Sequence, residues 1–211
     1  MRDLKEEEYS QVAKELDTCY KEDKDVLKKA IDKIFKKGMK EGIDLTLQEC
    51  KNVKGKRILD IACGTGSISM RLAKKGAFII GVDPSKYAID RANAIAKEEG
   101  LTQTCLFIRD DFAEHVFNQK FDITIALGFF DSAKDPELTI RKMRAVTTEK
   151  CLISFSAKFA FQVPLRLIWM RSRNLPVHLY TKKELKQLFS SSFSHFKIKN
   201  ISAGYYCVVK V

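Results

Sequence analysis

The feature that most constrains the fold is the stretch at residues 58–67, in which an apolar run ends in an acid and a glycine-rich turn. It predicts a strand, a tight turn and the start of a helix, because Gly64 and Gly66 permit backbone dihedral angles that are closed to residues with a Cβ atom. The glycines also let a ligand approach the main chain, and the first turn of a helix offers unpaired N–H groups. The stretch is typical of a cofactor site, although a tight strand-to-helix turn also needs glycine for steric reasons.

Beyond this stretch, strand-like apolar runs alternate with amphipathic segments. Connections of this kind join parallel strands, so the sequence predicts an open, doubly wound α/β sheet with its ligand site at the carboxyl ends of the strands. The last two strands flank Ala203 and Gly204 and predict an antiparallel hairpin. Strands are expected at 57–61, 77–82, 104–108, 122–127, 151–156, 195–201 and 205–211, and helices at 67–75, 85–99, from 135 onward and at 182–189.

Residues 1–52 are expected to form a helical N-terminal extension before a domain at residues 53–211. Apolar side chains recur there at spacings of three and four residues, which gives one apolar helical face. Gly38 and Gly42 are expected to interrupt the pattern, so that about two or three helices precede the first strand. The extension would either pack on the domain or act as a lid, with Tyr9 or Tyr20 capping a ligand.

Composition limits the class of protein. Apolar side chains make up 45% of the 211 residues, enough for the core of one domain. The charged N-terminus and the absence of an apolar run of about 18 residues predict no signal peptide and no membrane span, hence a cytoplasmic protein. Six widely spaced cysteines without a Cys-x-x-Cys pair favour free thiols over disulfides or a metal site, so no metal is expected.

The net charge of +11 is concentrated in residues 134–211, which carry 15 basic and 4 acidic side chains. A basic surface of this kind can face nucleic acid, anionic lipid or an acidic substrate. It can equally be an ordinary solvated lysine-rich surface, and charge alone does not separate these interpretations.

Acidic and glycine residues recur where the four predicted parallel strands end. Because such ends meet at one edge of a doubly wound sheet, these residues are expected to lie along a single rim. The acid 17 residues after the glycine turn is placed to accept hydrogen bonds from two ribose hydroxyls. The residues of this set are Asp60 with Gly64 and Gly66, Asp83, Asp110 with Asp111, and Leu127 with Gly128.

In its order and spacing this set resembles the class I S-adenosylmethionine-dependent methyltransferases. The resemblance covers about residues 57–157 and implies a Rossmann-like methyltransferase fold with a mostly parallel seven-stranded sheet. Its motifs are Ile58-Leu59-Asp60-Ile61-Ala62-Cys63-Gly64-Thr65-Gly66, Gly81-Val82-Asp83-Pro84-Ser85, Arg109-Asp110-Asp111-Phe112 and Phe121-Asp122-Ile123-Thr124-Ile125-Ala126-Leu127-Gly128.

The resemblance implies S-adenosylmethionine as the cofactor and assigns a role to each motif. Asp60 and the backbone at Ala62, Gly64 and Gly66 would hold the methionine part. Asp83, followed by Pro84, would bind the ribose hydroxyls, Asp111 would accept from the adenine amino group, Phe112 would cover the ring edge, and the Leu127 backbone would lie beside the methionine group. Ala62 stands where the family often has glycine, and it should fit if its φ angle is negative.

A nicotinamide-binding fold is the competing interpretation, since it also uses a Gly-x-Gly turn and an acid after the second strand. Two residues disfavour it. Ser69 replaces the third small residue of that fingerprint, and Asp60 would place a carboxylate beside a pyrophosphate, where like charges repel.

The methyl acceptor is expected to be a small molecule with a carboxylate or hydroxyl group. The sulfonium already activates the methyl, so the transfer mainly needs in-line positioning. A hydroxyl acceptor would benefit from a general base, for which His178 and Asp131 are the main candidates, whereas a carboxylate acceptor would need none.

The apolar and basic segment 158–178 is expected to cover the acceptor. A packing helix and an interfacial helix are the alternatives. The short pieces 65–69, 72–77 and 152–158 are similar to the magnesium-protoporphyrin O-methyltransferase branch, which implies a carboxylate on a large planar substrate. The expected substrate-binding residues are Phe130, Arg166, Trp169, Arg171 and Tyr180.

Two other functions stay open at this point. RNA or other nucleic-acid methylation is disfavoured, because Leu127-Gly128-Phe129-Phe130 lacks the Pro-Pro aromatic motif of amino methylases and no Pro-Cys nucleophile pair occurs. The chain could also be a cofactor-binding partner subunit without catalysis. The sequence does not predict the oligomeric state.

Overall fold

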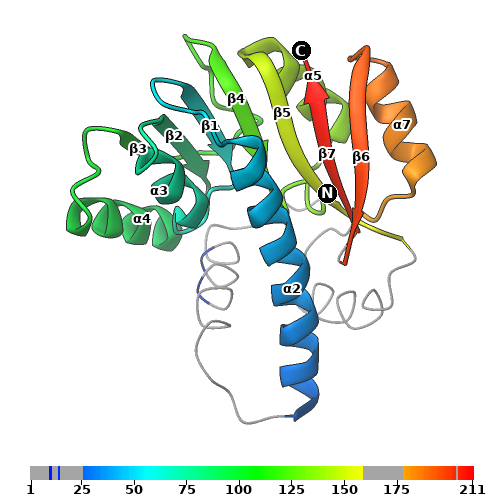
Figure 1. The fold of residues 1–211 in the computed structure, drawn as a ribbon, viewed down its shortest axis with the longest axis horizontal. Helices are drawn as coiled ribbons and strands as arrows, with labels where there is room; N and C mark the ends of the chain where they lie inside the picture. The colour runs from blue at the N-terminus through cyan, green and yellow to red at the C-terminus, as the bar shows by residue number, and fades with distance from the viewer. Residues whose placement is uncertain (1–9, 11–13, 15–25, 159–177, 203) are drawn as a thin grey trace.

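The protein, seen in a computed structural model, folds around one seven-stranded sheet with the order β3-β2-β1-β4-β5-β7-β6 (Figure 1). The structure describes residues 10, 14, 26–158, 178–202 and 204–211, and it describes the side chains of the long N-terminal helix from residue 37 onward. Strands β1 to β5 are parallel, and β7 lies antiparallel between β5 and β6. The predicted doubly wound sheet with a C-terminal hairpin is thereby confirmed.

The observed elements start and end within a few residues of the predicted ones. The largest shift is in β5, which begins at Thr147 because α5 runs straight into it. The elements are α2 (Val26–Glu49), β1 (Arg57–Ile61), α3 (Ser67–Ala73), β2 (Phe78–Asp83), α4 (Lys86–Glu98), β3 (Cys105–Arg109), β4 (Phe121–Ala126), α5 (Pro136–Val146), β5 (Thr147–Ser156), α7 (Lys182–Ser190), β6 (His195–Ile201) and β7 (Gly204–Lys210).

Helices cover both faces of the sheet and divide the core into two layers. Side chains alternate between the faces along each strand, so Ile58 of β1 packs on one side while Leu59 and Ile61 pack on the other. The first layer includes α3, α4 and the end of α2, and the second includes α5 and α7. Burial on both faces explains why the central strands are continuous apolar runs in the sequence.

Side-chain caps fix where α4 and α5 begin. The Ser85 hydroxyl accepts from the N–H of Ala88 at the start of α4. The Asp135 carboxylate accepts from the N–H of Leu138, with proline as the first residue of α5. Each cap satisfies an N–H group that the helix itself cannot pair, and each lies at the residue where the sequence predicts the helix to begin.

Helix α2 runs without interruption through Gly38 and Gly42, so the prediction that these glycines break the helix was wrong. Intrinsic helix preference is a weak influence when tertiary packing holds a helix in place. Gly42 is buried, and a Cβ atom there would lie 4.0 Å from Leu127 Cδ1 at the end of β4. A Cβ atom would thus make an ordinary contact with Leu127, so neither packing nor backbone conformation requires glycine at this position.

Polar contacts fasten the C-terminal half of α2 to the hairpin. The Thr46 hydroxyl lies 3.1 Å from the Tyr206 hydroxyl of β7, and both residues are buried. The Glu41 carboxylate accepts from the N–H and the hydroxyl of Ser202, each at 2.6 Å. The N-terminal half of α2 extends beyond the edge of the sheet at which the parallel strands end (Figure 1).

None of the helices in the described part of the chain has both the length and the apolar character needed to cross a bilayer. The five cysteines within the described residues are free thiols, as predicted, and four of them are buried. Cys19 lies outside the described residues.

Candidate functional site

The carboxyl ends of β3, β2, β1 and β4 lie side by side and form one rim. The pairing of Ile61 with Val82 and with Ala126 places β1 between β2 and β4. Asp83 pairs with Arg109, which brings the end of β3 beside the end of β2. The acids and glycines that the sequence placed at successive strand ends therefore lie along one continuous edge.

The glycine turn after β1 is tied directly to the acid that ends β2. The N–H of Gly64 donates to Asp83 Oδ2 at 3.0 Å, and the N–H of Cys63 donates to the carbonyl oxygen of Val82 at 3.2 Å. Gly64 has a φ of 54°, and a Cβ atom built on it would meet nothing within 4 Å. The space beside this residue is open, so the turn forms a cradle in which a ligand can approach the main chain.

The next glycine of the turn, Gly66, lies in crowded surroundings instead of open space. Gly66 has a φ of 79°, and a Cβ atom there would lie 2.9 Å from Phe107 Cζ. Phe107 belongs to β3 and is buried beneath the turn. Gly66 is therefore required by packing and backbone conformation, whereas Gly64 borders the open side of the cradle.

Ala62 adopts a φ of 53°, so the negative φ under which alanine was expected to fit without strain is not found. The left-handed conformation brings the Cβ atom of an L-residue close to the following carbonyl oxygen, at a cost of roughly 1–2 kcal/mol. The turn between β1 and α3 imposes this conformation although Ala62 has a Cβ atom.

Ala62→Gly is expected to stabilise the protein by about 0.5–1 kcal/mol, because the strain that it relieves exceeds the added entropy of the unfolded chain. The measurement is the free energy of unfolding from urea denaturation. Ala94→Gly, at an exposed position of α4, is the matched control and should destabilise by about 0.5–1 kcal/mol. Equal destabilisation by both changes would show that Ala62 is unstrained.

Asp60 is buried at the end of β1, with 5% of its surface exposed. The hydroxyl of Ser69, itself fully buried, donates to Asp60 Oδ2 at 2.6 Å. Burial raises the pKa of Asp60 to about 7; the Ser69 hydrogen bond opposes this shift and the nearby Asp83 adds to it. A carboxylate with this surrounding is well suited to a cationic partner, such as the ammonium group of a methionine.

Asp83 accepts one hydrogen bond on each carboxylate oxygen, from the N–H of Gly64 and from the N–H of Ser85 at 2.9 Å. Burial raises the pKa of Asp83, while the two hydrogen bonds lower it. Pro84, half-buried between Asp83 and Ser85, sets the turn into α4. Each oxygen retains a second lone pair, so the group can still accept from vicinal hydroxyls.

The raised pKa of Asp60 predicts that cofactor affinity increases with pH. The folded-state pKa of Asp60 lies above the ordinary value of 3.8. The protonated carboxyl group therefore stabilises the apo protein fully below pH 3.8, and this contribution is lost as the pH rises through about 7. A cationic ligand favours the ionised form, so Kd for S-adenosylmethionine should be about tenfold higher at pH 6 than at pH 8. Calorimetry at both pH values measures this.

Asp60→Asn is the matched control for the pH dependence, since it preserves the shape of the side chain and removes the titrating proton. Asp83, whose pKa is also raised, remains in this variant, so the difference between the two proteins isolates Asp60. A wild-type affinity that changes with pH no more than that of Asp60→Asn would contradict the prediction.

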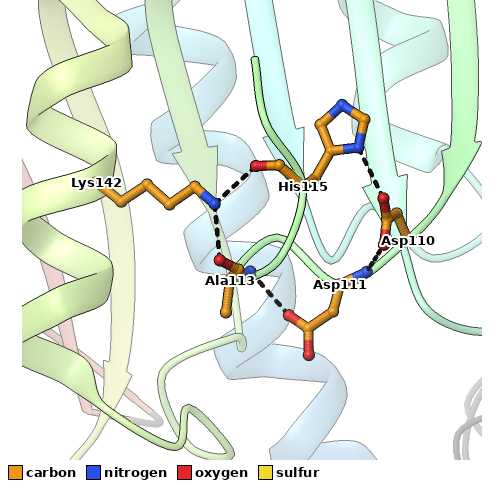
Figure 2. A network of polar contacts seen from close by, with 5 residues as sticks. All are labelled: Asp110, Asp111, Ala113, His115 and Lys142. Atoms are coloured by element: carbon orange, nitrogen blue, oxygen red, sulfur yellow. Dashed lines mark hydrogen bonds and ion pairs between the residues drawn. The ribbon is translucent and has the colours of Figure 1, made fainter.

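A turn after β3 carries the next two acids of the rim (Figure 2). Asp111 Oδ1 accepts from the N–H of Ala113 at 2.9 Å. Asp110 Oδ2 lies 2.8 Å from Nδ1 of His115, which lowers the pKa of Asp110. The N–H of Asp110 donates to the carbonyl oxygen of Asp83 at 3.2 Å, so the turn adjoins the ribose-binding candidate.

Phe112 lies in the core, with 1% of its surface exposed, and its ring packs on Phe117 and Phe129. Little of the ring is available to cover the edge of an adenine, so burial disfavours the expected role of Phe112. The ammonium of Lys142 lies 5.1 Å from the centre of the ring. The sequence had not singled out Lys142 or His115, because neither stands in a motif.

The rim continues at the end of β4. Leu127 is half-buried and packs against the layer that contains α3 and α4. Gly128 has a φ of 75°, and its N–H donates to the Ser154 hydroxyl of β5 at 2.8 Å. Leu127 thus follows directly after β4, whose end pairs with the end of β1.

Two described residues near the N-terminus reach the same rim. The hydroxyl of Ser10 lies 3.4 Å from that of Ser85, and the ammonium of Lys14 lies 5.6 Å from the centre of the Tyr87 ring. Both partners belong to the start of α4, directly after Asp83. Tyr9 and Tyr20, the predicted capping residues, lie outside the described residues.

Asp131 and His178, the two candidate bases, are adjacent. Asp131 is 2% exposed; Oδ1 accepts from the N–H of Ser156 at 3.1 Å, and Oδ2 accepts from its hydroxyl at 2.8 Å. This geometry favours a structural role in which Asp131 joins the ends of β4 and β5. The N–H of His178 donates to the Asp131 carbonyl oxygen at 2.8 Å, and His178 is only partly buried.

The predicted substrate-binding residues fall into two groups. Phe130 is fully buried, and its carbonyl oxygen accepts from the Tyr180 hydroxyl at 3.0 Å. Tyr180 is 8% exposed, and burial raises the pKa of its hydroxyl. Both side chains therefore occupy core positions, which favours packing over contact with an acceptor. The others, Arg166, Trp169 and Arg171, lie outside the described residues, as does most of the expected cover at 158–178.

Comparison with known proteins finds the same kind of domain. A family model described as a methyltransferase domain matches residues 52–200. The ubiquinone biosynthesis O-methyltransferase of Actinobacillus pleuropneumoniae serotype 7 is 31% identical over 120 residues, which are 54% of this chain and 50% of that protein. The Coxiella burnetii (strain Dugway 5J108-111) protein of the same name is 31% identical over 134 residues, 61% of this chain and 49% of its own. The chain spans about half the length of the curated relatives it matches.

Solved structures show the same fold. The magnesium protoporphyrin IX methyltransferase from Synechocystis PCC 6803, crystallised with bound SAH, superposes with a TM-score of 0.72 at 18% identity and covers 96% of this chain and 94% of its own. The family model matches well over half of the chain, and the open cradle beside Gly64 lies between two rim acids. The protein therefore belongs to the methyltransferase domain family, and the cofactor that fits its rim is S-adenosylmethionine.

Proposed function

We propose that the protein is an S-adenosylmethionine-dependent methyltransferase that methylates an oxygen atom of a small molecule. The observation that carries this proposal is the open cradle at Gly64, whose N–H is bonded to Asp83 while Asp60 lies buried at the end of the adjacent strand. Both relatives described above are named O-methyltransferases, which supports the choice of oxygen as the acceptor atom.

Each rim residue has a part in holding the cofactor. Asp60 would pair with the methionine ammonium, Asp83 would accept from the ribose hydroxyls, and the second oxygen of Asp111 would accept from the adenine amino group. The sulfonium supplies an activated methyl group. The protein contributes positioning of the acceptor for in-line attack, which can lower the barrier by roughly 7–11 kcal/mol.

We assign the acceptor side of the rim to the ends of β4 and β5. His178 would take the proton of a hydroxyl acceptor, since its side chain is partly accessible whereas the Asp131 carboxylate is held by Ser156. A carboxylate acceptor would need no base. Residues 158–178, with Arg166, Trp169 and Arg171, would cover the acceptor, and residues 1–52 would close over the cofactor.

The function is tested by binding and by turnover. Calorimetry should show binding of S-adenosylmethionine and S-adenosylhomocysteine, and incubation of labelled S-adenosylmethionine with panels of phenols and of aromatic carboxylates should yield a methylated product. Binding of a nicotinamide dinucleotide, but of neither adenosyl compound, would overturn the proposal. Cofactor binding without turnover on any panel would favour a non-catalytic partner subunit, and turnover only on RNA would favour the nucleic-acid alternative.

A further inference from the structure

The turn after β3 is held at its beginning by Asp111. The Asp111 carbonyl oxygen accepts from the N–H groups of Glu114 and His115, at 3.0 and 2.9 Å, while Oδ1 accepts from the N–H of Ala113. Within the described part of the chain, the second carboxylate oxygen of Asp111 has no hydrogen-bond partner, and it points away from the turn (Figure 2). The orientation of this oxygen therefore depends on the position of the whole turn.

The other end of the turn is held from a distant element. The Lys142 ammonium, on α5, donates to the carbonyl oxygens of Ala113 at 2.8 Å and His115 at 2.7 Å (Figure 2). The ammonium also lies over the ring of Phe112, the buried residue inside the same turn. Among the described residues Lys142 forms no ion pair with a carboxylate, so its hydrogen bonds are directed to the turn's main chain.

The Asp110 carboxylate forms two further contacts within the turn. Its Oδ2 lies 2.8 Å from Nδ1 of His115, and its Oδ1 accepts from the N–H of Asp111 at 2.8 Å. The turn is thus fixed by local contacts on one side and by α5 on the other. Hydrogen bonds from an ammonium to two carbonyls two residues apart are charge-assisted and restrict both the position and the rotation of the segment.

We propose that Lys142 is a positioning residue for adenine recognition, holding the turn at residues 110–115 so that the second oxygen of Asp111 meets the adenine amino group. This inference rests on the proposed role of Asp111 in binding the cofactor. Without the ammonium, the carbonyl groups of Ala113 and His115 would turn toward water. The rotation would carry Asp111 away from the amino group and leave the rest of the cradle in place.

The test compares S-adenosylhomocysteine with its inosine counterpart, which has a carbonyl oxygen in place of the adenine amino group and a proton on the adjacent N1. Lys142→Met retains the apolar stem and removes the ammonium. It should lower the preference for the adenosyl compound by about three- to tenfold, less than the full value of a hydrogen bond to a carboxylate because Asp111 is displaced and not removed, while affinity for the inosine compound changes little. Calorimetry supplies both dissociation constants.

Arg141→Met is the matched control, because Arg141 is the exposed neighbour on the same helix and the change removes one positive charge. It should leave the preference at the wild-type value, and Lys142→Arg, whose guanidinium can donate to two carbonyls, should restore most of it. If Lys142→Met does not fold, Lys142→Gln, which retains a neutral donor, should show the same direction of change.

The possible outcomes distinguish the role of Asp111 from that of Lys142. A wild-type protein that binds both compounds equally would refute the role of Asp111. A wild-type protein that prefers the adenosyl compound, with the same preference in Lys142→Met, would overturn the role of Lys142 alone. An equal loss of affinity for both compounds would assign Lys142 a general role in stability.

Discussion

Replacing His178 by glutamine is expected to lower kcat for a phenolic acceptor by about 100-fold or more, the contribution of a positioned general base. The Kd for S-adenosylmethionine should stay at the wild-type value, because no rim residue that contacts the cradle is changed. His178 is held at the ends of β4 and β5 by the hydrogen bond from its N–H to the carbonyl oxygen of Asp131. Steady-state turnover and calorimetry on the same preparation give both quantities.

His195→Gln is the matched control for this experiment. His195 begins β6 at the far edge of the sheet, is exposed, and its ring lies beside the Ser194 hydroxyl. This variant should turn over at the wild-type rate. Unchanged kcat in His178→Gln would exclude His178 as the general base for a phenolic acceptor.

Asp83→Ala is expected to weaken S-adenosylmethionine binding by about 1.5–3 kcal/mol, which corresponds to roughly a 10- to 150-fold rise in Kd. Two effects act in the same direction. The variant loses the acceptor for the ribose hydroxyls, and it frees the N–H groups of Gly64 and Ser85 that fix the cradle and the start of α4. Calorimetry with S-adenosylmethionine and S-adenosylhomocysteine measures the change.

Asp90→Ala controls for loss of a carboxylate near the same helix, since Asp90 is an exposed residue of α4 paired with Lys86. Exposed pairs of this kind contribute little, so its Kd should match that of the wild type. A folded Asp83→Ala protein with an unchanged Kd would exclude Asp83 from the cofactor site.

Most of the fold could be predicted from the sequence because its signals are local. The apolar runs of β1 and β4 are buried on both faces, and such strands are legible without any knowledge of their neighbours. The cap residues Ser85 and Asp135 act within three residues of themselves. The parallel topology then follows from the lengths of the connections, which brings the rim acids together.

Errors arose where the surroundings oppose a local preference. Glycine weakens a helix by only about 1 kcal/mol, so contacts of α2 with β7 and with the end of β4 can keep it continuous through Gly38 and Gly42. Ala62 is held at positive φ by the turn between β1 and α3, although alanine alone avoids that conformation. Neither result can be predicted from a short stretch of sequence alone.

The sequence by itself determined the order of strands and helices and the acids Asp60, Asp83 and Asp111 at their ends, since side-chain periodicity and turn chemistry are properties of neighbouring residues. Only the tertiary structure decided what those acids can do. It placed Ser69 on Asp60, fastened Gly64 to Asp83, and brought Lys142 from α5 to the turn that carries Asp111. These contacts join separate elements, and their geometry is set by how the helices pack on the sheet.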